Sequence, residues 1–108
     1  MSRIYLGELE ELILLIVALL NKEAYGVSIV EELKKHASRD ISISAVHAAL
    51  HRLEEKGFVK SKMGGASAER GGRRKRLFSI TTYGQNALEE LRDTRNLIWQ
   101  LIAKISPS

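Results

Sequence analysis

Apolar residues recur every three or four positions over most of the chain. This spacing holds for about residues 24–36, 44–56 and 82–104, while residues 12–20 are apolar almost throughout. Such spacing is typical of helices that bury one face. Two shorter stretches, 58–63 and 76–80, partly alternate and flank a segment with four glycines, which is typical of a β-ribbon with a loop at its tip. The pattern predicts a mostly α fold with a small β-ribbon.

The first predicted helix, residues 4–20, has no polar side from residue 12 onward. A helix of this kind has to be buried all round, yet a single domain of this size buries only about two-thirds of its unfolded surface. The last predicted helix, 82–104, is capped by Thr81 or Thr82 and has an apolar stripe interrupted by Arg95. We therefore expect both helices to lie in a homodimer interface. The expected interface residues are Leu12, Leu15, Ile16, Leu91, Ile98, Leu101, Ile102 and Ile105.

The helix predicted between Ser42 and Gly57 has two contrasting faces. Ser42 or Ser44 can accept an N–H group of its first turn, and Gly57 suits its end. Its core face is expected to consist of Val46, Ala49, Leu50 and Leu53. The opposite face has only small or hydrogen-bonding side chains, so it can approach a DNA groove closely, as the recognition helix of a winged helix-turn-helix does. The expected contact residues are Ser42, Ser44, Ala45, His47, Ala48, His51 and Arg52.

The charge of the chain is concentrated near the predicted ribbon. The formal net charge is +4, but residues 58–80 hold seven basic residues and one acidic residue, while residues 1–57 hold seven basic and nine acidic. A local positive field indicates a polyanion site; the alternative is a solvated charged loop. The basic residues expected to contact phosphates are Lys60, Lys62, Arg73, Arg74, Lys75 and Arg76.

Several function classes are disfavoured by the sequence. There is no cysteine, and no serine is accompanied by a base and an orienting group, so we expect no enzyme. His47 and His51 have a spacing that can seat a metal, but no third ligand accompanies them, and we expect neither a metal nor a cofactor. The apolar run is too short to cross a bilayer and no cleavable leader is evident, so a cytoplasmic protein without a membrane partner is expected.

Several short motifs together resemble the PadR family of transcriptional regulators over roughly residues 6–92. They are Ala24-Tyr25-Gly26 with Ile29, Ala49-Leu50-His51-Arg52-Leu53-Glu54 followed by Gly57-Phe58-Val59, and Ile80-Thr81 with Gly84 and Ala87-Leu88. The resemblance implies a homodimeric winged-helix repressor of the small-subunit branch. Its DNA-binding domain would span residues 1–80 and its C-terminal dimerisation helix residues 81–108. His47-Ala48 stands where the family commonly has Tyr-Pro, so a more regular recognition helix is expected.

The resemblance also implies a ligand site at the dimer centre. An aromatic residue in this region, here Trp99, would line a cavity that admits a small apolar or aromatic effector. The residues alone show only a large side chain on the flank of an apolar stripe, and a packing role is the alternative.

Two functional hypotheses remain. In the first, the helix from Ser44 enters the major groove of double-stranded DNA, with Arg52 and His51 at base edges. Arg52 could instead pair with a carboxylate such as Glu55 or Glu11. In the second hypothesis, the winged helix is a protein-interaction module that docks an acidic partner. The absence of a bulky anchor on the recognition face favours DNA.

Overall fold

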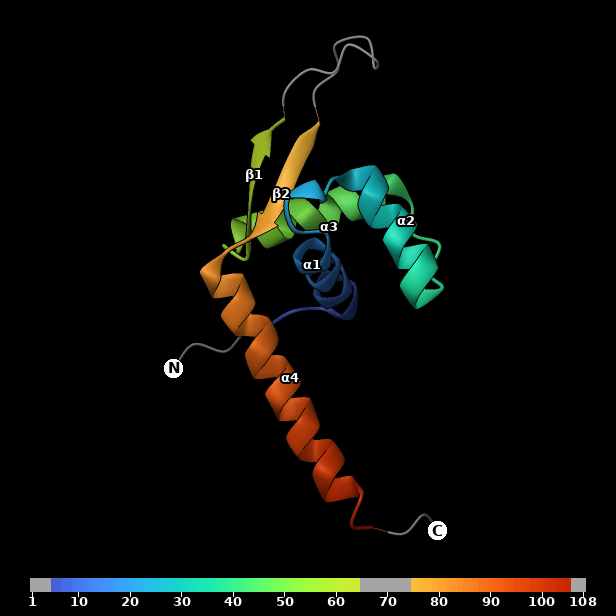
Figure 1. Cartoon of the computed structure of the whole chain (residues 1–108), viewed down its shortest axis with the longest axis vertical. Helices are drawn as coiled ribbons and strands as arrows, with labels where there is room; N and C mark the ends of the chain where they lie inside the picture. Colours follow the sequence, from blue (N-terminus) through green and yellow to red (C-terminus); the bar gives the residue numbers. More distant parts are fainter. Residues whose placement is uncertain (1–4, 65–74, 106–108) are drawn as a thin grey trace.

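Three helices gather beneath a two-stranded ribbon, and a fourth helix extends away from them (Figure 1). The computed structural model describes residues 5–64 and 75–105. In chain order the elements are α1 (Glu8–Leu20), the 3-10 turn η1 (Asn21–Glu23), α2 (Gly26–Ala37), α3 (Ile43–Glu55), β1 (Val59–Met63), β2 (Arg76–Ile80) and α4 (Thr82–Ile102). The prediction of a mostly α winged helix with a small β-ribbon is confirmed.

Helix α1 begins later than predicted and is buried on one side only. It starts at Glu8 after an extended Gly7; the predicted start at residue 4 lies outside the described residues. Ile13, Leu14 and Val17 are fully buried, whereas Leu15 and Leu19 are 45% and 60% exposed. Ile16 was expected in the dimer interface, but it is only 7% exposed because it packs into the chain's own core.

Helix α3 has the two faces that the sequence predicts. Val46, Ala49, Leu50 and Leu53 are buried in the core. Of the two candidate caps, Ser42 is the one used, and its hydroxyl accepts the N–H of Ala45 at 3.2 Å.

The ribbon is antiparallel, with Val59 opposite Ile80 and Met63 opposite Arg76. Its second strand also pairs with the segment before α2, because the N–H of Phe78 donates to the carbonyl of Ala24 at 2.8 Å. Side chains alternate between the two faces of a strand. One face therefore carries buried Phe78 and Val59 together with Ser61, and the other carries Lys60, Lys62, Leu77 and Ser79.

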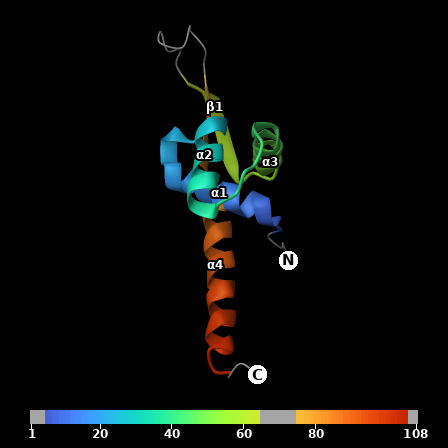
Figure 2. The ribbon, with the colours of Figure 1, turned by 90° about the vertical axis from the view of Figure 1, so that its right-hand side faces the viewer.

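Helix α4 starts inside the core and then leaves it. Thr81, rather than Thr82, is its cap, and its hydroxyl accepts the N–H of Gly84 at 3.0 Å. Gly84 and Ala87 are buried, whereas every residue from Arg92 to Ile105 is exposed. Figure 2 shows this second half projecting away from the other helices. Within the described part of the chain, no helix is both long and apolar enough to cross a membrane.

Candidate nucleic-acid interface

The outward face of α3 is open and carries only short or hydrogen-bonding side chains along most of its length. Ser44, His47, Ala48 and His51 are exposed, and Ala45 is half-buried beside them. Exposed Ser42 lies at the N-terminal end of the same helix. Ile43, in the first turn, is a large apolar side chain that is 43% exposed. From Ser44 to His51 no exposed side chain is larger than an imidazole, so this part of the helix backbone can come close to a groove floor.

Close packing of α2 on α3 positions one of these histidines. Gly26, in the first turn of α2, is buried, and a Cβ added there would lie 2.9 Å from the His47 ring and 2.8 Å from the Ile43 side chain. A side chain at this position would make Ile43 and His47 shift, so the glycine lets the start of α2 pack directly against these two side chains of α3. His47 therefore lies at the crossing of the two helices.

A buried carboxylate of α1 fixes the other end of α3. Glu10 is 5% exposed and accepts hydrogen bonds from three groups: Gly7 N–H at 3.0 Å, Arg52 Nε at 3.0 Å, and Lys56 Nζ at 2.9 Å to one oxygen and 3.2 Å to the other. Arg52 is thus a structural residue, as the alternative interpretation held, but its partner is Glu10 instead of Glu55 or Glu11. Only Nε of Arg52 is used in this contact, and half of its side chain is exposed, so a base contact by Arg52 stays a prediction.

The Glu10 carboxyl is held in its charged form. Burial by itself raises the pKa of Glu10, but the hydrogen bonds from Gly7, Lys56 and Arg52 outweigh it and hold the pKa below its usual range. A lowered folded-state pKa stabilises the fold above the unfolded-state pKa of about 4.5, and this contribution is lost as the pH falls through the folded-state value.

We expect Glu10→Gln to lower the free energy of unfolding by about 2 kcal/mol at pH 7, because two cationic side chains lose their anionic partner. The difference from the unmodified protein should shrink below pH 4.5, as measured by urea unfolding across the pH range. Glu31→Gln, at an exposed position of α2, is the control and should change little. A deficit that persisted unchanged at low pH would contradict the charged role of Glu10.

Two neighbouring carboxylates of α1 hold other parts of the chain. Glu8 accepts from Arg39, in the segment between α2 and α3, at 3.0 Å, and Glu11 accepts from Arg95 of α4 at 2.9 Å. The interruption of the α4 stripe by Arg95 is therefore explained by an ion pair. Helix α1 thus connects the recognition helix to the helix expected to form the dimer.

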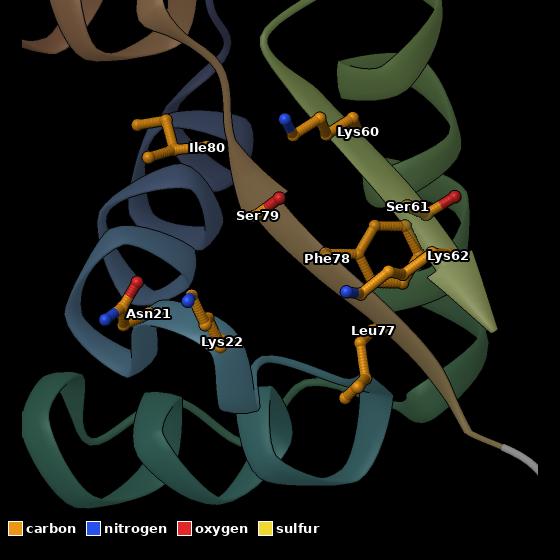
Figure 3. Close-up of a pocket in the computed structure, with 9 residues that line it drawn as sticks. All are labelled: Asn21, Lys22, Lys60, Ser61, Lys62, Leu77, Phe78, Ser79 and Ile80. Atoms are coloured by element: carbon orange, nitrogen blue, oxygen red, sulfur yellow. The ribbon is translucent and has the colours of Figure 1, made fainter. Parts of the chain in front are cut away.

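The basic residues of the ribbon divide between its two faces. Lys60 and Lys62 project from the face turned toward η1 (Figure 3). Arg76 is on the other face, where it donates to Ser61 Oγ at 3.0 Å, and Ser61 in turn donates to Glu54 of α3 at 2.7 Å. The structure therefore brings Arg76 close to α3 and places Lys60 and Lys62 elsewhere.

The remaining candidate DNA contacts are Lys75, Arg73, Arg74 and His51, and the structure describes two of them. Lys75 has its amino group 4.1 Å from the centre of the Tyr25 ring, a cation–π contact beside the start of α2. Arg73 and Arg74 lie outside the described residues. His51 Nε2 is 3.4 Å from the Glu55 carboxylate, and within residues 5–64 and 75–105 no group of three or more His, Asp or Glu side chains is arranged to hold a metal.

Comparisons with known proteins agree with this arrangement. A family model described as "Transcriptional regulator PadR-like family" matches residues 13–90. Among solved structures, the chain is similar to a PadR-like transcription factor from Bacteroides fragilis, with 25% identity, 93% of this chain and 91% of that chain covered, and a TM-score of 0.75. It is also similar to a PadR family transcription regulator from Clostridium difficile, with 22% identity, 91% and 97% covered, and a TM-score of 0.74. A search of the curated proteins finds no match.

Proposed function

Because the chain belongs to the PadR-like family of transcriptional regulators, we propose that it is a repressor that binds specific DNA sites as a homodimer. The observation that carries this proposal is the recognition helix itself. Helix α3 is anchored by buried Glu10 at one end and by α2 at the other, while its outward face remains open. A rigid helix with an open face of small side chains suits insertion into the major groove.

The proposed DNA contacts follow from which residues share the α3 side of the molecule. Ser44, His47, Ala48 and His51 would face bases, with Ser42 and Ala45 near the backbone. Arg52 is a further candidate base contact, and Arg76 would bind a phosphate beside these residues. Lys60, Lys62, Arg73, Arg74 and Lys75 are proposed as further phosphate contacts on the strength of the charge pattern of the sequence alone. Because phosphate contacts release counterions, the affinity should fall steeply as salt rises.

The homodimer is supported by apolar surface that the single chain leaves open. On α4, Leu97, Ile98, Leu101, Ile102 and Ile105 are 48–72% exposed, and on α1 Leu15 is 45% exposed. Leu12 and Leu91 are half-buried next to them. A two-fold dimer would present one recognition helix to each half-site, with half-sites about one helical turn apart. We keep the division into a DNA-binding domain, 1–80, and a dimerisation helix, 81–108, as part of this proposal.

Release by a small ligand is a further part of the proposal. Trp99 is 68% exposed in the single chain and lies on the helix that would meet its mate in the dimer. Two such side chains facing each other would form walls for a flat apolar or aromatic effector. A DNA-binding regulator has to reach the DNA that it controls, so we propose a cytoplasmic location.

Fluorescence anisotropy with a labelled duplex from the upstream region of its own gene and a shuffled duplex, at two salt concentrations, tests the function. We expect His51→Ala to weaken binding to the specific duplex by about fivefold or more, the cost of a lost base contact, and to leave the shuffled duplex unaffected. His36→Ala, at an exposed position of α2, is the matched control.

Two results would count against DNA regulation. If His51→Ala weakened both duplexes equally, the α3 face would not read bases. If the protein showed no preference for any duplex over heparin, even after genome-wide site selection, the proposal would give way to a module that docks an acidic protein.

A further inference from the structure

A depression of about 500 Å³ lies in the corner between η1 and the outer face of the ribbon (Figure 3). Its walls come from three elements that are separate in the sequence. Asn21 and Lys22 come from η1, Lys60 and Lys62 from β1, and Leu77 and Ser79 from β2. Ser61, which contacts Arg76 and α3, also lines the corner, but Arg76 and the residues of α3 do not.

The charge around this corner is uncompensated. Lys22, Lys60 and Lys62 all line it, and no aspartate or glutamate does. Within the described residues, none of these three amino groups has an ion-pair or hydrogen-bond partner, whereas six ion pairs between other lysines or arginines and carboxylates are formed there. Three ammonium groups around one concave surface create a positive potential that an anion would relieve.

The floor of the corner is apolar. Half-buried Leu77 is on the same face as the lysines, and Phe78 and Ile80, whose side chains are on the opposite face of β2, are also among the lining residues. The uncharged polar residues Asn21, Ser61 and Ser79 also line it. An inorganic phosphate would use the lysines but not the floor, whereas a flat apolar ring with one anionic group would use both.

We propose that this corner binds a small organic anion with a flat apolar body, whose carboxylate or sulfonate is held by Lys22 and Lys60. The corner is lined by residues of η1 and the ribbon, whereas Trp99 lies in the second half of α4, which projects away from the other helices (Figure 2), so this is not the effector site at the dimer centre. A second consequence rests on the proposed function: occupancy neutralises lysines of the ribbon and lowers the affinity for DNA.

Amide-resolved NMR titration of the full-length protein with 2-naphthoate tests the site. We expect saturable shifts at the amides of Asn21, Lys22 and Ser79. The double variant Lys22→Ala/Lys60→Ala should weaken binding by about fivefold or more, the combined effect of two exposed charge contacts. Lys35→Ala, an exposed lysine at the far end of α2, should bind as the unmodified protein does. The neutral analogue 2-naphthamide should bind much more weakly.

Three outcomes would overturn the site: shifts confined to the indole of Trp99 and its surroundings, equal binding of 2-naphthamide, or unchanged binding by the double variant. The site would also be overturned if 2-naphthoate did not bind while Lys22→Ala weakened DNA binding, because the corner would then be a phosphate contact. The NMR titration contains no DNA. A negative result would therefore refute the anion site without bearing on whether the protein binds DNA. Anisotropy with the specific duplex and added 2-naphthoate tests the second consequence separately, and unchanged DNA affinity would refute that part alone.

Discussion

Replacing Gly84 by alanine is expected to lower the free energy of unfolding by about 3 kcal/mol. A Cβ at this position would collide with the carbonyl oxygen of Phe58 and lie 2.9 Å from Cγ1 of Ile80. The carbonyl cannot simply turn away, because it accepts the N–H of Thr81 at 3.0 Å and is 3.1 Å from the Thr81 hydroxyl. Helix α4 would have to move off the ribbon, and the cap formed by Thr81 would be disturbed. Urea unfolding at a fixed protein concentration measures the change.

The control is Asn86→Ala, which lies two residues further along the same helix and is exposed. Alanine is a better helix former than either asparagine or glycine, so both substitutions would stabilise a freely exposed helix, by up to about 1 kcal/mol at a glycine. The two variants should therefore change stability in opposite directions. A Gly84→Ala variant as stable as the unmodified protein would show that α4 does not approach the Phe58 backbone this closely.

The buried face of α3 could be predicted from the sequence because it depends only on the spacing of residues within this helix. The core positions Val46, Leu50 and Leu53 follow one helical period, and all three are buried. The choice between Ser42 and Ser44 as cap was not decidable in this way, since both hydroxyls can accept an N–H from a first turn. The structure selects Ser42 through its bond to Ala45.

The role of Glu10 could not be predicted from local pattern. An acidic residue in the first turn of a helix already has an explanation in the helix dipole. Its partners Arg52 and Lys56 are 42 and 46 residues away in sequence, so only the tertiary fold brings them together. For the same reason, the sequence could suggest that Arg52 pairs with a carboxylate but could not identify Glu10 as that carboxylate.

For the ribbon, the sequence could not predict which face packs against the helices. Counting charges located a positive region, and strand alternation shows that Lys60 and Lys62 share a face. Neither argument tells which face packs on the helices, because apolar Leu77 and Phe78 lie on opposite faces of the same strand. Burial of Phe78 rather than Leu77 settles it, and it directs both lysines toward η1.

Helix α1 links the two parts of the proposed regulator. Its adjacent residues Glu10 and Glu11 bind Arg52 of α3 and Arg95 of α4, respectively. The exposed side of the same helix carries Leu15, which we assign to the dimer interface. A displacement of α4 or of a partner subunit would therefore reach the recognition helix through a single rigid element.

Ile98→Asp is expected to convert the dimer into a monomer and to weaken binding to the specific duplex by about a hundredfold or more. Ile98 is 50% exposed in the single chain, so the substitution costs the monomer little. In a two-fold dimer the same change buries two unpaired carboxylates, at several kcal/mol of lost association energy. A monomer reaches only one half-site, and the effective concentration that links the two recognition helices disappears. Light scattering coupled to size-exclusion chromatography gives the oligomeric state, and anisotropy gives the affinity.

Gln100→Asp separates the interface from a general effect of charge on α4. Successive helical residues are rotated by about 100°, so Gln100 projects from nearly the opposite side of the helix to Ile98. The Gln100→Asp variant should remain dimeric and bind the specific duplex with the affinity of the unmodified protein. If Ile98→Asp remained a dimer, the apolar stripe would not be the interface. If it became monomeric yet bound the duplex with unchanged affinity, each recognition helix would act alone, and the two-half-site arrangement would be wrong while DNA binding itself stood.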